Sequence, residues 1–306
     1  MKSAFLFPGQ GSQYEGMLND LPDDPVVKNI LEESSELLHT PIESLHSKKA
    51  LSTTKAVQQC LLIAAVSTYK VFEKNGLMPT YVAGHSVGAF GAATAAGVIT
   101  FAEALKLVTL RGELMEKTCD EGYGMAVVLG LDEYRLSEIV NSLFDAEEPV
   151  YVSNRNAPTQ ITLSGSLRGL QKVIDYVTSH GATAARLLNV STPSHSPLFN
   201  QVSEELFREL DKLELKRPKI PISSNITSRL LMQADTVKED LAKSICYPVR
   251  WHDAANLLFE SGTEIFIEMP PGDVLSKLAK QAFSEARTMS AAKNGLEDCL
   301  YVMSNS

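Results

Sequence analysis

Residues 81–96 read YVAGHSVGAFGAATAA. The first three residues are typical of a short buried strand, and the small residues after Val87 are typical of a helix that packs closely on its neighbours. Between them, GHSVG places Ser86 in a tight strand-to-helix turn with a glycine on either side. That context favours a nucleophile elbow, in which the helix N-terminus directs N–H groups at an oxyanion, over an incidental serine in a glycine-rich turn.

Strand-like and helix-like patterns alternate on both sides of this turn. A strand is predicted at residues 4–7, helices at 25–38, 53–75 and 101–117, and further buried strands at 220–223 and 264–268. Such alternation predicts an α/β fold with a mainly parallel sheet covered on both faces. The order changes to β-α-β-β-α-β between residues 122 and 191, which is typical of a ferredoxin-like unit. We therefore expect a core formed by residues 1–121 and 192–306, with residues 122–191 as an inserted subdomain.

Composition excludes several classes of protein. The 306 residues are 44% apolar, and 28 basic residues against 37 acidic ones give a formal charge of -9. No basic footprint for nucleic acid or for an anionic membrane is visible, so neither is expected as a partner. The four cysteines form no CxxC pair, which indicates reduced thiols in a cytoplasmic protein and no bound metal. The apolar run at residues 4–7 is too short for a signal peptide.

A serine hydroxyl needs a base to become a good nucleophile. The chain has six histidines. One adjoins Ser86, two lie in polar segments and one lies at a helix end, which makes these four poor candidates for the base. His195 and His252 remain. We expect His195 to be the base, because two prolines stiffen its loop, STPSHSP; a surface histidine is the alternative. No acidic residue between Ser86 and His195 stands out, which leaves a backbone carbonyl to fix the imidazole tautomer.

Arg111 falls within the apolar stripe of the helix predicted at 101–117. An unpaired buried charge is costly, so this guanidinium needs a partner. One interpretation is a structural ion pair, or a side chain that reaches out to solvent. The other is a two-pronged site for a substrate carboxylate.

Together these stretches resemble the malonyl-CoA:acyl carrier protein transacylase family. The matching segments follow the family's order along nearly the whole chain: FPGQGSQ at 7–13, GHSVG at 84–88, LRGELM at 110–115, NRNAPTQITLSG at 154–165, STPSHSPLF at 191–199, SNIT at 224–227 and YPVRW at 247–251. The resemblance implies an α/β-hydrolase-like core with an inserted ferredoxin-like subdomain and no bound cofactor.

By position, the resemblance implies that Ser86 accepts the acyl group, that His195 is its base and that Arg111 binds the malonyl carboxylate. It also implies supporting roles: an oxyanion hole from the main-chain N–H groups of Gln10 and Val87, a backbone carbonyl at Arg250 that orients His195, and cleft-lining positions at Asn156 and Gln160. Members of the family commonly carry Gln where this chain has Arg250.

The implied substrates are malonyl-CoA and the pantetheine-type thiol of an acyl carrier protein, with a malonyl-serine intermediate between two half-reactions. GHSVGA at 84–89, PPG at 270–272 and LPDDP at 21–25 look like the malonyltransferase (epsilon) subunit of malonate decarboxylase, so its carrier subunit is the expected acceptor. The alternative is the transacylase of fatty-acid synthesis. Interpretations of other classes are a serine thioesterase or hydrolase, with water as acceptor, and a silent scaffold for a carrier complex.

Overall fold

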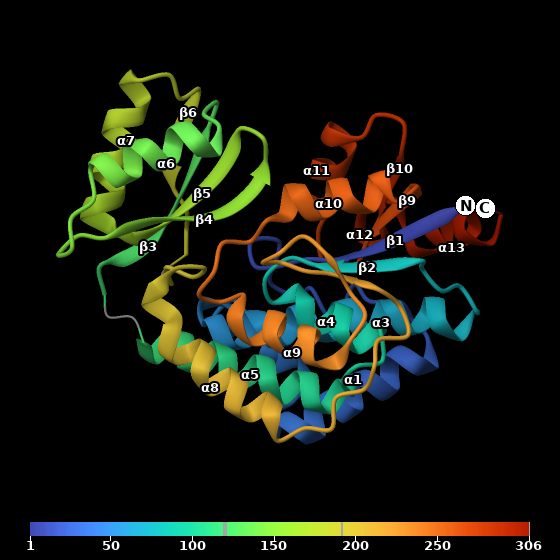
Figure 1. The fold of residues 1–306 in the computed structure, drawn as a ribbon. Coiled ribbons are helices and arrows are strands. Elements are labelled where there is room, and N and C mark those ends of the chain that lie inside the picture. The colour runs from blue at the N-terminus through green and yellow to red at the C-terminus, as the bar shows by residue number, and fades with distance from the viewer. Residues whose placement is uncertain (119–120, 191, 306) are drawn as a thin grey trace.

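The computed structural model describes residues 1–118, 121–190 and 192–305, so Cys119 and Ser191 lie outside the described residues. Within these ranges the strands form one sheet of six strands and one of four, which we call the large sheet and the small sheet. Figure 1 shows the small sheet and its helices to one side of a larger body that holds both chain termini.

The large sheet is parallel through its first five strands. Its order is β10 (Arg287–Ser290), β9 (Thr263–Glu268), β1 (Lys2–Phe7), β2 (Tyr81–Gly84), β7 (Ile222–Ser223) and β8 (Leu230–Leu231). The last pair, β7 with β8, is antiparallel. All of β2 and all but the first residue of β1 are buried, as expected for parallel strands covered on both faces. The prediction of a mixed α/β fold with a parallel-rich sheet is confirmed.

Alternate side chains of β1 enter two different hydrophobic cores. Phe5 and Phe7 pack into the core built by α3 (Thr54–Lys74), α4 (Gly88–Ala95) and α5 (Phe101–Thr118). Ala4 and Leu6 enter the opposite core with α10 (Trp251–Glu260) and α11 (Val274–Ala282). The other helices of this body are α1 (Pro25–Leu38), α2 (Ile42–Leu45), α8 (Asn200–Asp211), α9 (Ala234–Lys243), α12 (Ala291–Asn294), α13 (Leu296–Ser304) and the 3-10 turns η1 (Ala50–Ser52) and η2 (Pro197–Phe199).

The small sheet is antiparallel throughout, in the order β4-β5-β3-β6. Its elements all fall within residues 122–191, the span that the sequence predicts as a separate unit: β3 (Tyr123–Leu129), α6 (Glu133–Ser142), β4 (Val150–Ala157), β5 (Gln160–Ser166), α7 (Leu167–Ser179) and β6 (Ala184–Leu187). Leucines and valines of α6 and α7 cover one face and form a third core.

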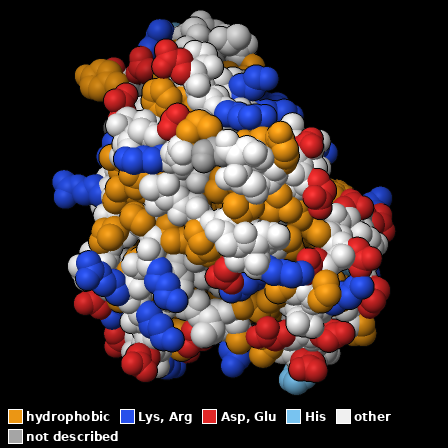
Figure 2. Space-filling view, turned by 90° about the vertical axis from the view of Figure 1, so that its right-hand side faces the viewer, with side chains coloured by type: hydrophobic (Ala, Val, Ile, Leu, Met, Phe, Trp, Pro, Cys, Tyr) orange, Lys and Arg blue, Asp and Glu red, His pale blue; other side chains and the backbone are white. Residues whose placement is uncertain are grey.

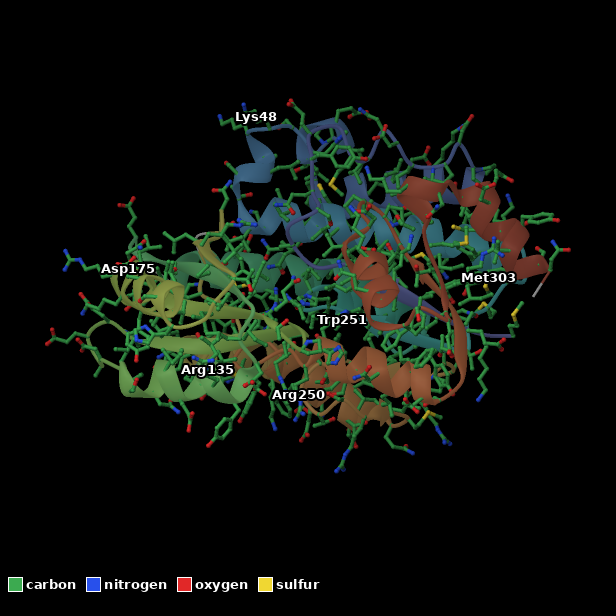
Figure 3. The ribbon with its side chains drawn as sticks, turned by 90° about the horizontal axis from the view of Figure 1, so that it is seen from above. Lys48, Arg135, Asp175, Arg250, Trp251 and Met303 are labelled. Carbon is green, nitrogen blue, oxygen red and sulfur yellow. The ribbon has the colours of Figure 1, made fainter. Side chains whose placement is uncertain are left out.

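The two sheets are joined where β4 meets the segment before α10. The Val249 N–H donates to the Ser153 carbonyl, and the Arg155 N–H donates to the Val249 carbonyl, each at 2.8 Å. The Arg155 guanidinium adds ion pairs to Glu133 on α6 at 2.7 Å and to Asp253 on α10 at 3.0 Å. Figure 3 shows Arg250 and Trp251 near this junction, between Asp175 at one end of the molecule and Met303 at the other.

On the face shown in Figure 2, acidic and basic side chains are interspersed. No helix in the described part of the chain is both long enough and apolar enough to cross a membrane.

Candidate active site

Ser86 occupies the turn between β2 and α4 with a φ of 55°, a left-handed conformation that is uncommon for a residue with a side chain. Gly88 makes the turn possible, because a Cβ there would lie 2.1 Å from the Phe7 carbonyl oxygen. A Cβ on Gly84 would lie 2.2 Å from the backbone of Gly88. The end of β1 can therefore approach the serine turn only because Gly88 lacks a side chain, and the turn itself can close only because Gly84 lacks one.

His195 reaches Ser86 across 109 positions of sequence, and its Nε2 lies 2.8 Å from the serine Oγ. Its Nδ1 lies 2.6 Å from the carbonyl oxygen of Ser244. A carbonyl can only accept a hydrogen bond, so Nδ1 carries the proton and the Nε2 lone pair faces the serine hydroxyl. The His195 N–H donates to the Ile245 carbonyl at 2.7 Å, so one short segment holds both the ring and the backbone of this residue.

The prediction that the Arg250 carbonyl orients His195 is wrong; the Ser244 carbonyl does so. Arg250 immediately precedes α10, and its carbonyl accepts the Ala254 N–H at 2.9 Å within the first helical turn. Ser244 immediately follows α9, where helix carbonyls lack intrahelical partners, so its oxygen is available to the imidazole. The Arg250 guanidinium instead pairs with Asp253 at 2.8 Å.

Burial, together with the positive charge of Arg111, lowers the pKa of His195 to about 3. The side chain is 2% exposed. The imidazole is therefore neutral at physiological pH, which is the form that can accept a proton from Ser86.

Arg111 is fully buried on α5, and one of its Nη atoms lies 3.2 Å from the Ser86 Oγ. Its other Nη lies 3.3 Å from the Met115 sulfur, and its Nε has no hydrogen-bond partner. Among the described residues no carboxylate pairs with this cation, and burial lowers its pKa to about 9. The structural ion pair and the solvent-reaching side chain are therefore both excluded. A buried cation aimed at a nucleophile remains.

The N–H groups assigned to the oxyanion hole are free. No acceptor among the described residues takes the N–H of Gln10 or of Val87. The N–H of Ser86, by contrast, is donated to Asn225 Oδ1 at 2.9 Å. Val87 follows Ser86 directly in the chain, and Gln10 lines the pocket that contains Ser86, so both N–H groups remain candidates for an oxyanion hole.

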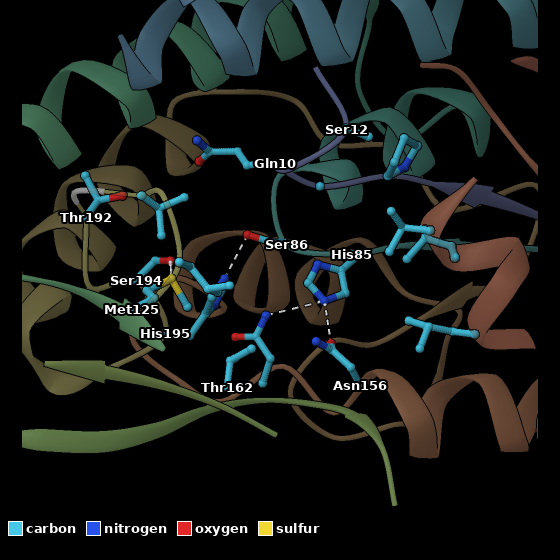
Figure 4. Close-up of a pocket in the computed structure, with 18 residues that line it drawn as sticks. Gln10, Ser12, His85, Ser86, Met125, Asn156, Thr162, Thr192, Ser194 and His195 are labelled. Carbon is cyan, nitrogen blue, oxygen red and sulfur yellow. Dashed lines mark hydrogen bonds between the residues drawn. The ribbon is translucent and has the colours of Figure 1, made fainter. Parts of the chain in front are cut away.

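A pocket of about 160 Å³ opens over Ser86 and His195, with walls from the small sheet and from loops and a helix of the large-sheet body (Figure 4). The small sheet contributes Met125, Asn154, Asn156 and Thr162, and α11 contributes Val274, Leu275 and Leu278. Asn156 therefore lines the cleft as predicted, and its Oδ1 lies 3.1 Å from His85 Nε2. Gln160 does not: it lies two residues before Thr162 on the same face of β5, beyond the pocket.

Sequence reasoning missed Gln58 on α3, which is fully buried beside the site. Its Nε2 lies 3.1 Å from the Met115 sulfur and 3.4 Å from Gln10 Oε1, while its own Oε1 has no partner. A glutamine within a buried apolar helix face was the available signal. Asn225 lies within the SNIT motif, but the motif alone did not indicate its role. Ser244 contributes only its backbone carbonyl, so its residue type gave no signal.

Comparison with known proteins places this geometry in a family. The sequence pattern of the acyl transferase domain matches residues 4–295. The malonyl CoA-acyl carrier protein transacylase of Bacillus subtilis strain 168 is 34% identical over 296 residues, which cover 95% of this chain and 93% of that protein. The chain belongs to the malonyl-CoA:acyl carrier protein transacylase family.

Solved structures of the transacylase family share the whole fold. The acyl-carrier-protein S-malonyltransferase of Burkholderia pseudomallei 1710b superposes with a TM-score of 0.93 at 34% identity, covering 98% of this chain and 100% of that one. A malonyl-transacylase solved in complex with its type II polyketide acyl carrier protein gives 0.93 at 32% identity, with 100% of both chains covered. The resemblance to the transacylase family read from the motifs is confirmed.

Proposed function

We propose that this protein transfers a malonyl group from malonyl-CoA to the thiol of an acyl carrier protein, through a malonyl ester on Ser86. The observation that carries the proposal is Arg111, a fully buried cation that no carboxylate of the described residues pairs with, 3.2 Å from the Ser86 Oγ. The free carboxylate of a malonyl group can pair with this guanidinium. An acetyl group would leave it unpaired, and polar sites reject such analogues strongly.

The first half-reaction uses the hydrogen bond between Ser86 and His195. The serine Oγ attacks the thioester carbonyl while His195 Nε2 takes its proton, and the N–H groups of Gln10 and Val87 receive the oxyanion. When the C–S bond breaks, the CoA sulfur takes that proton from His195 and leaves as the thiol. In the second half-reaction the carrier thiol gives its proton to His195 and its sulfur attacks the malonyl ester. As the ester C–O bond breaks, the Ser86 Oγ takes that proton from His195, and the malonyl group remains on the carrier as a thioester.

Substrate binding also strengthens the base. The charge of Arg111 contributes to the low pKa of His195 in the free protein. A malonyl carboxylate paired with Arg111 offsets that charge, so protonation of His195 becomes easier once the substrate is bound. The proposed chemistry draws on no metal and no bound cofactor.

The acceptor that we propose is an acyl carrier protein of the kind that serves fatty-acid synthesis, with a pantetheine-type arm. The similar proteins are named as transferases that act on an acyl carrier protein, and this favours an acyl carrier protein as the acceptor. The carrier subunit of malonate decarboxylase is supported only by three sequence features, GHSVGA at 84–89, PPG at 270–272 and LPDDP at 21–25. Turnover with a pantetheine-armed carrier and with a phosphoribosyl-dephospho-CoA-armed carrier distinguishes the two acceptors.

We further propose that residues 122–191 form a ferredoxin-like subdomain on an α/β-hydrolase-like core. The β-α-β-β-α-β element order and the strand order β4-β5-β3-β6 support the first assignment. The serine turn between a parallel strand and a helix supports the second.

The covalent route is tested by incubating the protein with malonyl-CoA, quenching in mild acid and measuring intact mass. We expect a malonyl mass that maps to Ser86 and disappears when a carrier thiol is added. An unmodified protein would argue against the route. Rapid release of malonate without a carrier would favour the hydrolase, and full function of Ser86→Ala would favour the scaffold.

The role of Arg111 is tested by Arg111→Ala, compared on malonyl-CoA and acetyl-CoA. We expect the preference for malonyl to fall by roughly 10²-fold or more, because the variant no longer offers a cation to the carboxylate. Arg208→Ala is the matched control, since Arg208 is 64% exposed on α8. If the two substrates keep their ratio in Arg111→Ala, the assignment of Arg111 is wrong.

A further inference from the structure

Ser86 is held from behind by a residue that does not line the pocket. Its N–H donates to Asn225 Oδ1 at 2.9 Å, and Asn225 is 3% exposed in the loop after β7. Ser86 has a φ of 55°, a conformation that persists only when its surroundings hold it. The bond holds the peptide group between His85 and Ser86, and the backbone angles of Ser86 then set the direction of the next N–H, that of Val87.

Asn225 is oriented in turn by Asp240 on α9. One carboxylate oxygen of Asp240 accepts the Asn225 N–H at 3.2 Å and its Nδ2–H at 3.4 Å. The other accepts from the Ser224 hydroxyl and, at 3.2 Å, from the Ile226 N–H. Because a carboxylate cannot accept from an amide oxygen, the Nδ2 contact turns Asn225 Oδ1 toward Ser86. Burial raises the pKa of Asp240, and the hydrogen bonds from these four donors oppose that rise.

The backbone of Asp240 leads to the base. The Ser244 N–H donates to the Asp240 carbonyl at 2.9 Å in the last turn of α9. The Ser244 carbonyl then accepts from His195 Nδ1. Asp240 therefore connects to the nucleophile through its side chain and to the base through its main chain.

We propose that Asp240 is a positioning residue, which aligns Ser86 through Asn225 and His195 through the end of α9. Asp240 contacts neither Ser86 Oγ nor His195 Nε2, so it acts only through these neighbours. The rival interpretation is a structural one, in which Asp240 merely anchors residues 224–226 to α9. The proposal rests on the proposed function only in taking Ser86 and His195 as the nucleophile and its base.

Asn225→Ala and Asp240→Asn test alignment with a fluorophosphonate, which phosphonylates an activated serine whatever its acyl specificity. Intact mass gives both the fraction of molecules that react and the rate constant for those that do. A positioning role predicts a rate constant lowered by roughly 10²-fold with the full fraction still reactive. A reduced reactive fraction with an unchanged rate constant would mean that the residues serve only folding, and would overturn the proposal.

A reciprocal exchange keeps the test decisive where a single variant folds poorly. Asn225→Asp alone places two carboxylates, at positions 225 and 240, against each other. In the double variant with Asp240→Asn, the carboxylate at position 225 can accept the Ser86 N–H, and the amide at position 240 can donate to that carboxylate. We expect the double variant to recover the rate constant at least about 10-fold over Asn225→Asp, because the two positions are coupled. No recovery in a folded double variant would count against the proposal.

Glu239→Gln is the matched control, because Glu239 adjoins Asp240 on α9, is exposed and pairs only loosely with Lys243 at 3.7 Å. It should phosphonylate at the wild-type rate. The same series with malonyl-CoA separates the two proposals. Suppose that the wild-type protein does not react with malonyl-CoA while the variants still react more slowly with the fluorophosphonate. That result would contradict the proposed function and would still support the positioning role.

Discussion

The body built on the large sheet and the small sheet both border the pocket over Ser86, but they contribute different groups to it. Ser86 follows β2 of the large sheet, His195 is held by the carbonyl that follows α9, and Arg111 projects from α5. The small sheet supplies wall side chains such as Met125 and Thr162. The groups to which we assign the chemistry thus lie on one body, and the second body shapes the space above them.

This division follows from sheet topology. Parallel strands end at the same edge of a sheet, so loops from distant parts of the sequence meet there, and ligands of open α/β sheets bind outside those ends. An antiparallel sheet has no such common edge, and the small sheet instead presents side chains from one face. We therefore expect substitutions in the large-sheet body to change the rate of chemistry, and those in the small sheet to have weaker effects.

The largest effect should come from His195→Ala. Without the base, acylation of Ser86 should slow by roughly 10⁴-fold or more, measured in a single turnover with malonyl-CoA. Thr162→Val, a near-isosteric change on the opposite wall, should slow it by less than about 10-fold. A Thr162 variant as slow as His195→Ala would break the comparison, because the small sheet would then hold a reacting group.

The next effect concerns a buried carboxyl of the large sheet, Glu268 at the end of β9. Burial raises its pKa from 4.5 to about 7, and its Oε1 has no partner. The unfolded chain loses this proton near pH 4.5 but the folded chain keeps it to about pH 7, so stability falls as pH rises between these values. The free energy of unfolding of the wild-type protein should fall by about 3 kcal/mol over this pH range because of Glu268, and Glu268→Gln should not show that fall.

Urea unfolding at pH 4.5 and pH 8 measures this difference. Glu264→Gln, at the single exposed position of β9, is the control and should leave the profile unchanged. Parallel profiles for wild type and Glu268→Gln would show that Glu268 ionises normally. The small sheet has no counterpart, since none of its described carboxyl side chains is buried.

The smallest effect should come from the junction itself. Arg155 pairs with Glu133 on one side and Asp253 on the other and is 26% exposed, so the two ion pairs are partly screened by water. Arg155→Ala should lower the free energy of unfolding by about 1 kcal/mol while leaving phosphonylation of Ser86 unchanged. Arg168→Ala, an 88% exposed arginine paired at 3.9 Å within the small-sheet unit, is the control. Slower phosphonylation of Ser86 in Arg155→Ala would show that the junction also affects how Ser86 and His195 are aligned.

Local patterns predicted the parts of this site that depend on neighbours in sequence. The serine turn followed from glycines between a strand and a helix, and the burial of Arg111 followed from its place in an apolar stripe. Whether Arg111 had an internal partner could not be predicted, because that depends on which carboxylates the fold brings close. The meeting of Ser86 with His195 rests on tertiary packing for the same reason.

Positions defined by backbone geometry were the least predictable. Every residue has a carbonyl, so nothing in the sequence distinguished Ser244 from Arg250; the difference lies in where α9 ends and α10 begins. The prediction that Gln160 lines the cleft was wrong for a similar reason, because the position of Gln160 along β5 relative to the pocket depends on where the β4–β5 hairpin turns.

A base oriented by the Ser244 carbonyl rather than by a carboxylate side chain gains mutational robustness. No exchange of side chain at position 244 can remove the acceptor, so that residue can drift during evolution while the imidazole keeps its tautomer. What selection must preserve there is the place at which α9 stops, a property shared among many residues and invisible to any motif.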